Sequence, residues 1–251
     1  MKSGLVVRSH IFTQIPGLIF GMSTRHGGVS PAPLEMNLSF SVGDDASNVR
    51  ENRKRFAEML GVSFDRIAFA GQVHGTNVSL VSEPGKSEYC DALITGTGGL
   101  FVAISVADCL PIFLYDPVTR SIAGVHSGWR GTKDRIVERA VILLREYRGA
   151  RTADLLAWLG PAAGSCCYEI GEEVAVQFDP LYVMRTEGRK PHLDLKSCNR
   201  DLLLAAGVSA EKIEVTPDCT IHQGEIYHSF RRDGNKSGRM WVVMGMQNSA
   251  I

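Results

Sequence analysis

The chain has 251 residues, of which 44% are hydrophobic, and its formal charge is zero because 27 basic residues balance 27 acidic ones. This length and apolar content suffice for one large domain with a substantial core. The balanced charge creates no overall field that would attract nucleic acid or an anionic membrane, so we expect neither as a partner.

The beginning of the chain predicts a cytoplasmic protein. The apolar run 5–7 is followed at once by Arg8, so it is too short for the core of a signal peptide. No apolar stretch approaches the length that crosses a bilayer. The six cysteines include the adjacent pair Cys166 and Cys167, and we expect free thiols in a reducing compartment, most of them buried.

Short apolar runs between turns predict strands along most of the chain, many of them rich in β-branched and aromatic residues. The predicted strands are 5–7, 66–70, 78–81, 92–95, 100–106, 112–116, 121–126, 157–159, 213–215 and 241–245. Because most are linked by short turns, such as the one around Pro117, we expect largely antiparallel pairing.

Four segments have the spacing of amphipathic helices. Ser47 is a suitable cap for the first, which Gly61 ends, and Thr132 precedes a second that ends before Gly149. The others are expected at 171–178 and 197–206. In the first helix, Asn52 and Arg53 fall on the inward face, which predicts a buried polar pair. No repeat or linker divides the chain, so a single mixed α and β domain is expected over 1–251.

Three side chains that commonly bind metals lie where predicted strands end. His74 stands in the loop GQVHG, Cys109 in the segment ADCLP, and His126 at the beginning of HSGWRGT. The predicted hairpin 112–126 brings Cys109 and His126 to the same end of a sheet, whereas His74 would join them through tertiary packing. Pro111, just after the cysteine, is expected to break the strand ladder.

Thiolate and imidazole ligands are typical of zinc, and three protein ligands leave one coordination position for water or substrate. Such a site suits hydrolysis or group transfer through an activated water. The same atoms allow a metal-free interpretation, in which Cys109 is a nucleophile and His126 or His74 its base, as in a cysteine hydrolase or deamidase. A non-catalytic binding module is the third interpretation.

Two arginine-containing segments are candidates for contact with an anion. Arg25 precedes a pair of glycines, an arrangement found both in small anion-binding turns and in plain surface turns. Near the other end, Arg231, Arg232 and Arg239 stand among glycine turns, where solvated charge is the alternative to phosphate contact.

Taken in order, these motifs resemble the laccase-domain family, the YfiH-like group once called multicopper polyphenol oxidases. The resemblance rests on GQVHG at 71–75, DAL at 91–93, ADCLP at 107–111, HSGWRGT at 126–132, LGP at 159–161, CYEIGEEV at 167–174 and SFRRDG at 229–234. It spans nearly the whole chain in order and spacing. Ser127 stands where the family usually has alanine, and Ala163 where it favours an aliphatic residue; neither change removes a ligand.

The resemblance implies a single four-layer α/β/β/α domain with mixed, largely antiparallel sheets, and a zinc site at His74, Cys109 and His126. It also implies phosphorolysis of the purine nucleosides adenosine, inosine and methylthioadenosine by phosphate, giving the base and ribose 1-phosphate, with adenosine deamination at the same site. We expect Arg25 to contact phosphate or ribose through its planar guanidinium, and Asn37 to orient the nucleoside.

The family's older name leaves a copper-dependent polyphenol oxidase as an alternative. A multicopper oxidase holds a mononuclear copper and a trinuclear cluster through many histidines, often in His-x-His pairs. This chain has seven histidines and no such pair. We therefore predict zinc as the cofactor, with copper as an alternative metal that could oxidise phenols at the His-Cys-His set.

Overall fold

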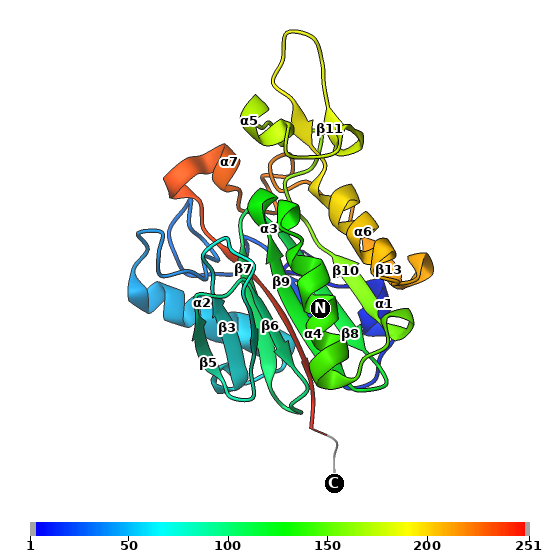
Figure 1. The fold of residues 1–251 in the computed structure, drawn as a ribbon. Coiled ribbons are helices and arrows are strands. Elements are labelled where there is room, and N and C mark those ends of the chain that lie inside the picture. Colours follow the sequence, from blue (N-terminus) through cyan, green and yellow to red (C-terminus); the bar gives the residue numbers. More distant parts are fainter. Residues whose placement is uncertain (1–3, 249–251) are drawn as a thin grey trace.

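Two six-stranded sheets lie face to face in the computed structural model, which describes residues 4–248 (Figure 1). The first sheet has the order β1 (Val6–Val7), β2 (Leu18–Ser23), β14 (Met240–Met246), β7 (Phe101–Val106), β3 (Ile67–Gly71), β5 (Gly85–Glu88). The second has the order β13 (Ile213–Val215), β10 (Leu156–Leu159), β8 (Leu110–Asp116), β9 (Ser121–Ser127), β6 (Ala92–Thr95), β4 (Val78–Leu80). A small third sheet pairs β11 (Val183–Met184) with β12 (His192–Leu193).

Both large sheets are mixed, and antiparallel pairs prevail. Within the described residues, six strand pairs of the two sheets are antiparallel. Four pairs are parallel: β10 with β13, β3 with β5, β3 with β7, and β4 with β6. The expectation of largely antiparallel, mixed sheets is confirmed.

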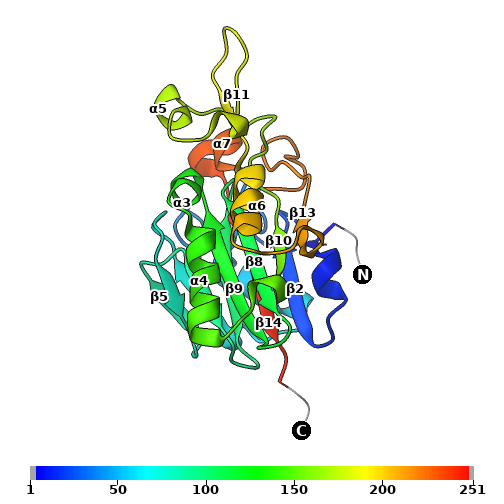
Figure 2. The same ribbon diagram turned by 45° about the vertical axis from the view of Figure 1, so that its right-hand side comes forward.

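Helices cover the outer faces of both sheets, as Figures 1 and 2 show from two sides. The helices are α1 (His10–Thr13), α2 (Ala46–Leu60), α3 (Trp129–Lys133), α4 (Ile136–Arg148), α5 (Glu172–Ala175), α6 (Leu195–Ala205) and α7 (Phe230–Asp233). Helix α2 packs Phe56 and Leu60 against the first sheet, whereas α4 packs Val137 and Val141 against the second.

The main core lies between the two sheets. Phe20 of β2 meets Phe113 of β8 and Trp158 of β10 edge to face, with ring centroids 5.8 and 4.8 Å apart, respectively. All three side chains are buried, and each therefore contributes apolar area that water would otherwise cover. The two sheets and the two helical layers confirm the predicted α/β/β/α arrangement within one domain. The predicted range 1–251 includes 1–3 and 249–251, which lie outside the described residues.

Two predicted helix starts are corrected. Asp45, not Ser47, caps α2, because its carboxylate accepts the backbone N–H of Ser47 at 2.6 Å; Gly61 ends the helix as expected, with φ 72°. Thr132 lies inside α3 instead of preceding one long helix. Its hydroxyl is bound in a buried network, and Arg135 with φ 60° separates α3 from α4.

Pro111 was expected to interrupt the ladder, but it lies inside β8, opposite His126 of β9. Its carbonyl oxygen accepts the N–H of Gly160 at 3.0 Å, on the side where β10 has already ended. The N–H that proline lacks therefore has no strand partner to lose.

Strand β2 was not predicted, although it lies between β1 and β14. Gly21 interrupts its apolar run, and glycine is depleted in strands. The structure supplies the reason for the glycine: a Cβ there would lie 2.7 Å from side-chain atoms of both Leu60 and Val6. The absence of a side chain at Gly21 thus lets α2 lie close against the sheet.

None of the helices described for residues 4–248 is both long and apolar enough to cross a bilayer. All six cysteines are free thiols, as expected. Cys90, Cys198 and Cys219 are buried, whereas Cys109, Cys166 and Cys167 are not, so the expectation that most are buried holds for only half of them.

His228 is fully buried, and neither of its ring nitrogens has a hydrogen-bonding partner among the described residues. Burial, reinforced by the charge of Arg25, lowers the pKa of His228 to about 3. A histidine in the unfolded chain titrates near pH 6.5, so at intermediate pH only the unfolded chain binds this proton. The stability that His228 contributes is thus complete above about pH 6.5 and is lost as the pH falls from there towards about 3.

We expect the free energy of unfolding to fall by a few kcal/mol between about pH 6.5 and 4, part of it through His228. The substitution His228→Leu removes this titration and should flatten the dependence. Urea unfolding of both proteins across this range measures the difference. Parallel pH profiles for the two proteins would contradict the assignment.

Candidate metal centre

His74, Cys109 and His126 converge at one end of the sandwich. A ring nitrogen of each histidine and the sulfur of Cys109 all lie within 4.8 Å of one another. His74 follows β3, Cys109 directly precedes β8, and His126 belongs to β9. The pairing of Leu110 with Ser127 in the β8–β9 hairpin places Cys109 beside the end of β9. The expected adjacency of Cys109 and His126 is therefore present, and tertiary packing adds His74.

Asp91 organises two of these three residues, and the sequence analysis did not include it among the site residues. One carboxylate oxygen accepts the backbone N–H of His74 at 2.9 Å and the ring Nδ1–H of His126 at 2.8 Å. The other accepts the N–H groups of Val73 at 3.1 Å and Gly75 at 2.7 Å. Because Asp91 holds Nδ1 of His126, Nε2 is the ring nitrogen available to a metal, which would replace the proton on it.

The position of Asp91 carried one sequence signal. An acidic residue stands directly before the apolar strand β6, and it is completely buried in the structure. A buried carboxylate needs several hydrogen-bond donors, so such a residue indicates a built polar site. Only the tertiary structure shows that the donors come from the loop that carries His74 and from β9.

Cys109 and His126 stabilise each other's charged form. Burial by itself raises the pKa of the Cys109 thiol, but the two imidazoles outweigh it and lower that pKa to about 6. Burial lowers the pKa of His126, whereas the Cys109 thiolate and the hydrogen bond to Asp91 raise it to about 9. Near neutral pH the two side chains are therefore a thiolate and an imidazolium, and a metal that binds Nε2 of His126 would displace its proton.

The backbone around the three side chains leaves them room and holds them in place. A Cβ at Gly128, which caps α3, would lie 2.9 Å from the Cys109 sulfur and 3.6 Å from Cδ2 of His74. Asp108 has φ 86°, and its carboxylate accepts the Thr220 hydroxyl and the backbone N–H of Arg231, both at 2.6 Å. The absent Cβ and the fixed turn together keep a space beside the thiolate.

His74, Cys109 and His126 line a cleft of about 780 Å³. Arg53 of α2 extends into it, with its guanidinium carbon 4.4 Å from the ring centre of Phe40 and 4.3 Å from that of Trp241. Burial lowers the pKa of Arg53 to about 10, which still leaves it charged at neutral pH. Both members of the predicted pair are buried, as expected. Asn52 is held in structural hydrogen bonds, and Arg53 donates Nε–H to the Leu38 carbonyl oxygen while it also lines the cleft.

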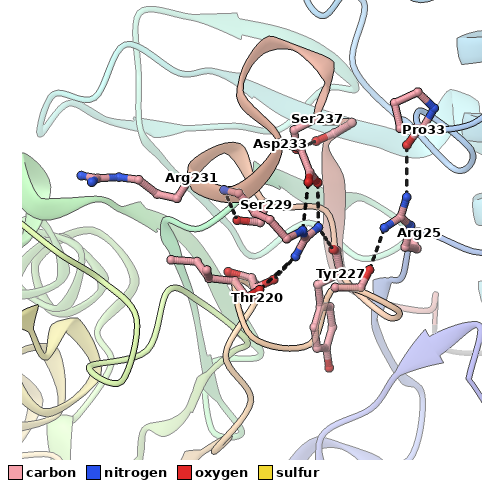
Figure 3. A network of polar contacts seen from close by, with 12 residues as sticks. Arg25, Pro33, Thr220, Tyr227, Ser229, Arg231, Asp233 and Ser237 are labelled. Atoms are coloured by element: carbon pink, nitrogen blue, oxygen red, sulfur yellow. Dashed lines mark hydrogen bonds and ion pairs between the residues drawn. The ribbon is translucent and has the colours of Figure 1, made fainter.

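Two further arginines line the cleft from the segment that contains α7. Arg231 lies over the Tyr168 ring at 4.8 Å, and its side chain extends away from the network drawn in Figure 3. Arg239 donates to the carbonyl oxygens of Ser237 and Gly238 through one terminal nitrogen. Arg232, in contrast, is absent from the cleft lining and binds Thr220, Tyr227 and Asp233 within the network.

The structure does not bring Arg25 or Asn37 into this cleft. Nε of Arg25 forms a 2.6 Å ion pair with Glu35, and its terminal nitrogens donate to the carbonyl oxygens of Gly224 and Pro33 (Figure 3). Asn37 is fully buried and bound to Ser39 and Asp44, among others. Both side chains are thus bound to other parts of the protein, and the substrate roles expected for them stay predictions.

Comparison with known proteins relates this site to a family. Residues 19–247 match the family model described as multi-copper polyphenol oxidoreductase laccase. The chain belongs to this laccase family. Over 229 residues it is 42% identical to a purine nucleoside phosphorylase of Deinococcus radiodurans, covering 89% of this chain and 87% of that protein.

Another relative and a solved structure also match the chain over most of its length. The chain is 34% identical over 224 residues to adenosine deaminase RL5 from an unknown prokaryotic organism, covering 82% of this chain and 85% of that one. The crystal structure of YlmD from Geobacillus stearothermophilus has a TM-score of 0.91 at 31% identity, covering 99% of this chain and 98% of that chain. The predicted family and its fold are confirmed.

Proposed function

We propose that this chain is a zinc-dependent purine nucleoside phosphorylase that also deaminates adenosine. The observation that carries the proposal is the convergence of His74, Cys109 and His126 in a cleft lined by aromatic rings and arginines. Relatives named as a purine nucleoside phosphorylase and an adenosine deaminase support it, because they match the chain over most of its length.

The three side chains fit a zinc ion chemically. Two imidazoles and a thiolate are ligands that zinc prefers, and Gly128 leaves space next to the sulfur. Bound there, zinc would supply a Lewis acid and an activated water for the attack on C6 of adenosine. Asp91 keeps the proton of His126 on Nδ1, so that Nε2 faces the cleft as a ligand. The His-Cys-His set is also suitable for copper, which remains the alternative ion.

The remainder of the cleft suits a nucleoside and an anion. Phe40, Tyr89 and Phe230 line the cleft with exposed rings, against which a purine can stack. Arg231 and Arg239 supply guanidinium groups that match phosphate oxygens. In phosphorolysis a phosphate oxygen forms a bond to C1′ of ribose while the C1′–N9 bond breaks. The electron pair of the broken bond leaves with the base. Phosphate held by these arginines would be positioned for that attack.

Incubation of metal-analysed protein with adenosine, with and without phosphate, tests the proposal. We expect adenine and ribose 1-phosphate only with phosphate, inosine in both cases, and loss of all products in a zinc chelator. Activity that survives the chelator but is lost with iodoacetamide would instead indicate the metal-free Cys109–histidine deamidase. Phenol oxidation that needs added copper would indicate the polyphenol oxidase, and no turnover would indicate a binding module.

The substitution Arg239→Gln is expected to raise the KM for phosphate by roughly 10-fold or more, because a hydrogen bond to a charged group contributes about 1.5–3 kcal/mol. Adenosine deamination, which needs no phosphate, should change much less. Steady-state kinetics of both reactions measure the split. Arg55→Gln is the control, since Arg55 is paired with Glu51 on α2 outside the cleft. An unchanged KM for phosphate in the Arg239 variant would contradict this role.

A further inference from the structure

A second group of convergent thiols lies apart from the metal centre. The sulfur atoms of Cys166, Cys167 and Cys219 all lie within 4.8 Å of one another. Those of the two adjacent cysteines are 3.3 Å apart, so both side chains point to the same side of the chain. The proposed function uses none of the three.

The backbone around these thiols is arranged to hold them together. A parallel bridge joins Ala162 to Cys219, and the N–H of Gly164 donates to the Cys219 sulfur at 3.2 Å. The two segments that carry the cysteines are therefore fixed to each other. A backbone N–H directed at sulfur stabilises the thiolate form, because it places positive partial charge against the negative sulfur.

Gly164 also keeps a space open between the sulfurs. A Cβ at this position would lie 3.3 Å from the Cys219 sulfur and 3.4 Å from the Cys166 sulfur. Both distances are shorter than comfortable van der Waals contact, so any other residue would crowd the thiols. The glycine leaves room there for an atom that contacts several sulfurs at once.

A buried ammonium group close to the thiols favours their negatively charged form. Lys196 is buried, and its ammonium group donates to the carbonyl oxygens of Thr216 at 2.7 Å and Asp218 at 2.6 Å, next to Cys219 in the chain. This fixed positive charge offsets part of the negative charge that several thiolates would bring. It makes an anionic sulfur–metal assembly acceptable in a partly buried position.

We propose that Cys166, Cys167 and Cys219 form a second metal site that binds monovalent copper through sulfur alone. Sulfur-only donor sets select soft ions such as Cu(I). Three sulfurs about 2.3 Å from a shared ion lie roughly 4 Å apart, so the observed spacing needs little closure. A closed zinc site has four protein ligands, and the described residues place no fourth histidine, cysteine or carboxylate in this group. Three-coordinate Cu(I) needs none.

The second site is separate from the first but is connected to it through Asp108. The N–H of Ala163 donates to the Asp108 carbonyl at 2.8 Å, and Thr220, next to Cys219, binds the Asp108 carboxylate. Cys109 follows Asp108 directly in the chain. A test must therefore measure the thiol site in a protein whose first site has lost its sulfur.

The experiment uses full-length, reduced Cys109→Ser protein under anaerobic conditions, with Cu(I) in competition with the coloured Cu(I) chelator bathocuproine disulfonate. We expect this protein to retain copper, and an added Cys166→Ser substitution to weaken Cu(I) binding by more than about 100-fold, beyond the range seen for outer-shell changes. Cys166 is exposed, so folding is preserved. Cys198→Ser in the same background is the matched control and should bind copper as before.

Gly164→Ala provides a second variant that leaves every thiol in place. Its Cβ would crowd the ion, so we expect weaker Cu(I) binding here too, with the same number of titratable thiols. Equal copper affinity in the Cys166→Ser variant and the Cys198→Ser control would overturn the proposal. If the Cys109→Ser protein bound zinc at these thiols but not Cu(I), the choice of ion would be overturned. Neither outcome depends on nucleoside turnover, so both are distinguishable from a failure of the proposed enzyme activity.

Discussion

Replacing Cys109 with serine is expected to remove tight zinc binding and to lower kcat/KM for nucleosides by a factor on the order of 10³ or more, the scale measured when a central catalytic group is lost. A serine hydroxyl is not ionised near neutral pH, whereas the pKa of the Cys109 thiol is about 6. The substitution thus removes the only anionic ligand of the trio and leaves the two histidines.

The measurements are zinc content after dialysis and the rates of phosphorolysis and deamination. Cys198→Ser is a suitable control, because Cys198 is a free thiol on α6, away from the cleft. It should retain zinc and both activities. A Cys109→Ser protein that keeps its zinc and its rates would refute the assignment of this sulfur as a ligand.

Replacing Asp91 with asparagine is expected to weaken zinc binding by roughly 10–100-fold and to destabilise the fold. Each carboxylate oxygen accepts two hydrogen bonds, so the NH₂ group of asparagine must face N–H donors whichever way the amide lies. Every buried donor left without an acceptor costs about 1–3 kcal/mol. The proton position on His126 is also no longer fixed by a carboxylate.

Zinc competition with a chromophoric chelator and urea unfolding of the zinc-free protein separate the two effects. Asp116→Asn is the matched control: Asp116 is equally buried, at the opposite end of β8, and accepts the N–H of Val118 and the Thr119 hydroxyl. It should lose stability without losing zinc affinity. If both variants bound zinc equally well, Asp91 would have no part in the metal centre.

Local patterns in the sequence predict most of the elements but not their placement. The hairpin β8–β9 is predictable because a short turn joins two apolar runs, and its register then places Cys109 beside His126. The parallel pair β3–β7 is not predictable from local patterns. Three strands lie between β3 and β7 in the chain, of which β5 belongs to the first sheet and β4 and β6 to the second. Short-range turn chemistry carries no information about such crossings.

The site shows the same division. His74, Cys109 and His126 have residue types that suggest chemistry by themselves. Asp91 acts only through donors that tertiary packing brings to it. The glycines after Arg25 suggested an anion-binding turn, but they gave no sign of its partner Glu35, which lies ten residues further on.

The position of β14 determines when the fold can be completed. This wholly buried strand lies between β2 and β7, so the first sheet remains in two pieces until residues 240–246 have left the ribosome. During synthesis the facing edges of β2 and β7 are unpaired, and unpaired edges readily join strands of other nascent chains. Closure of the first sheet thus waits for β14, and until this strand inserts, chaperones that shield strand edges would protect the nascent chain.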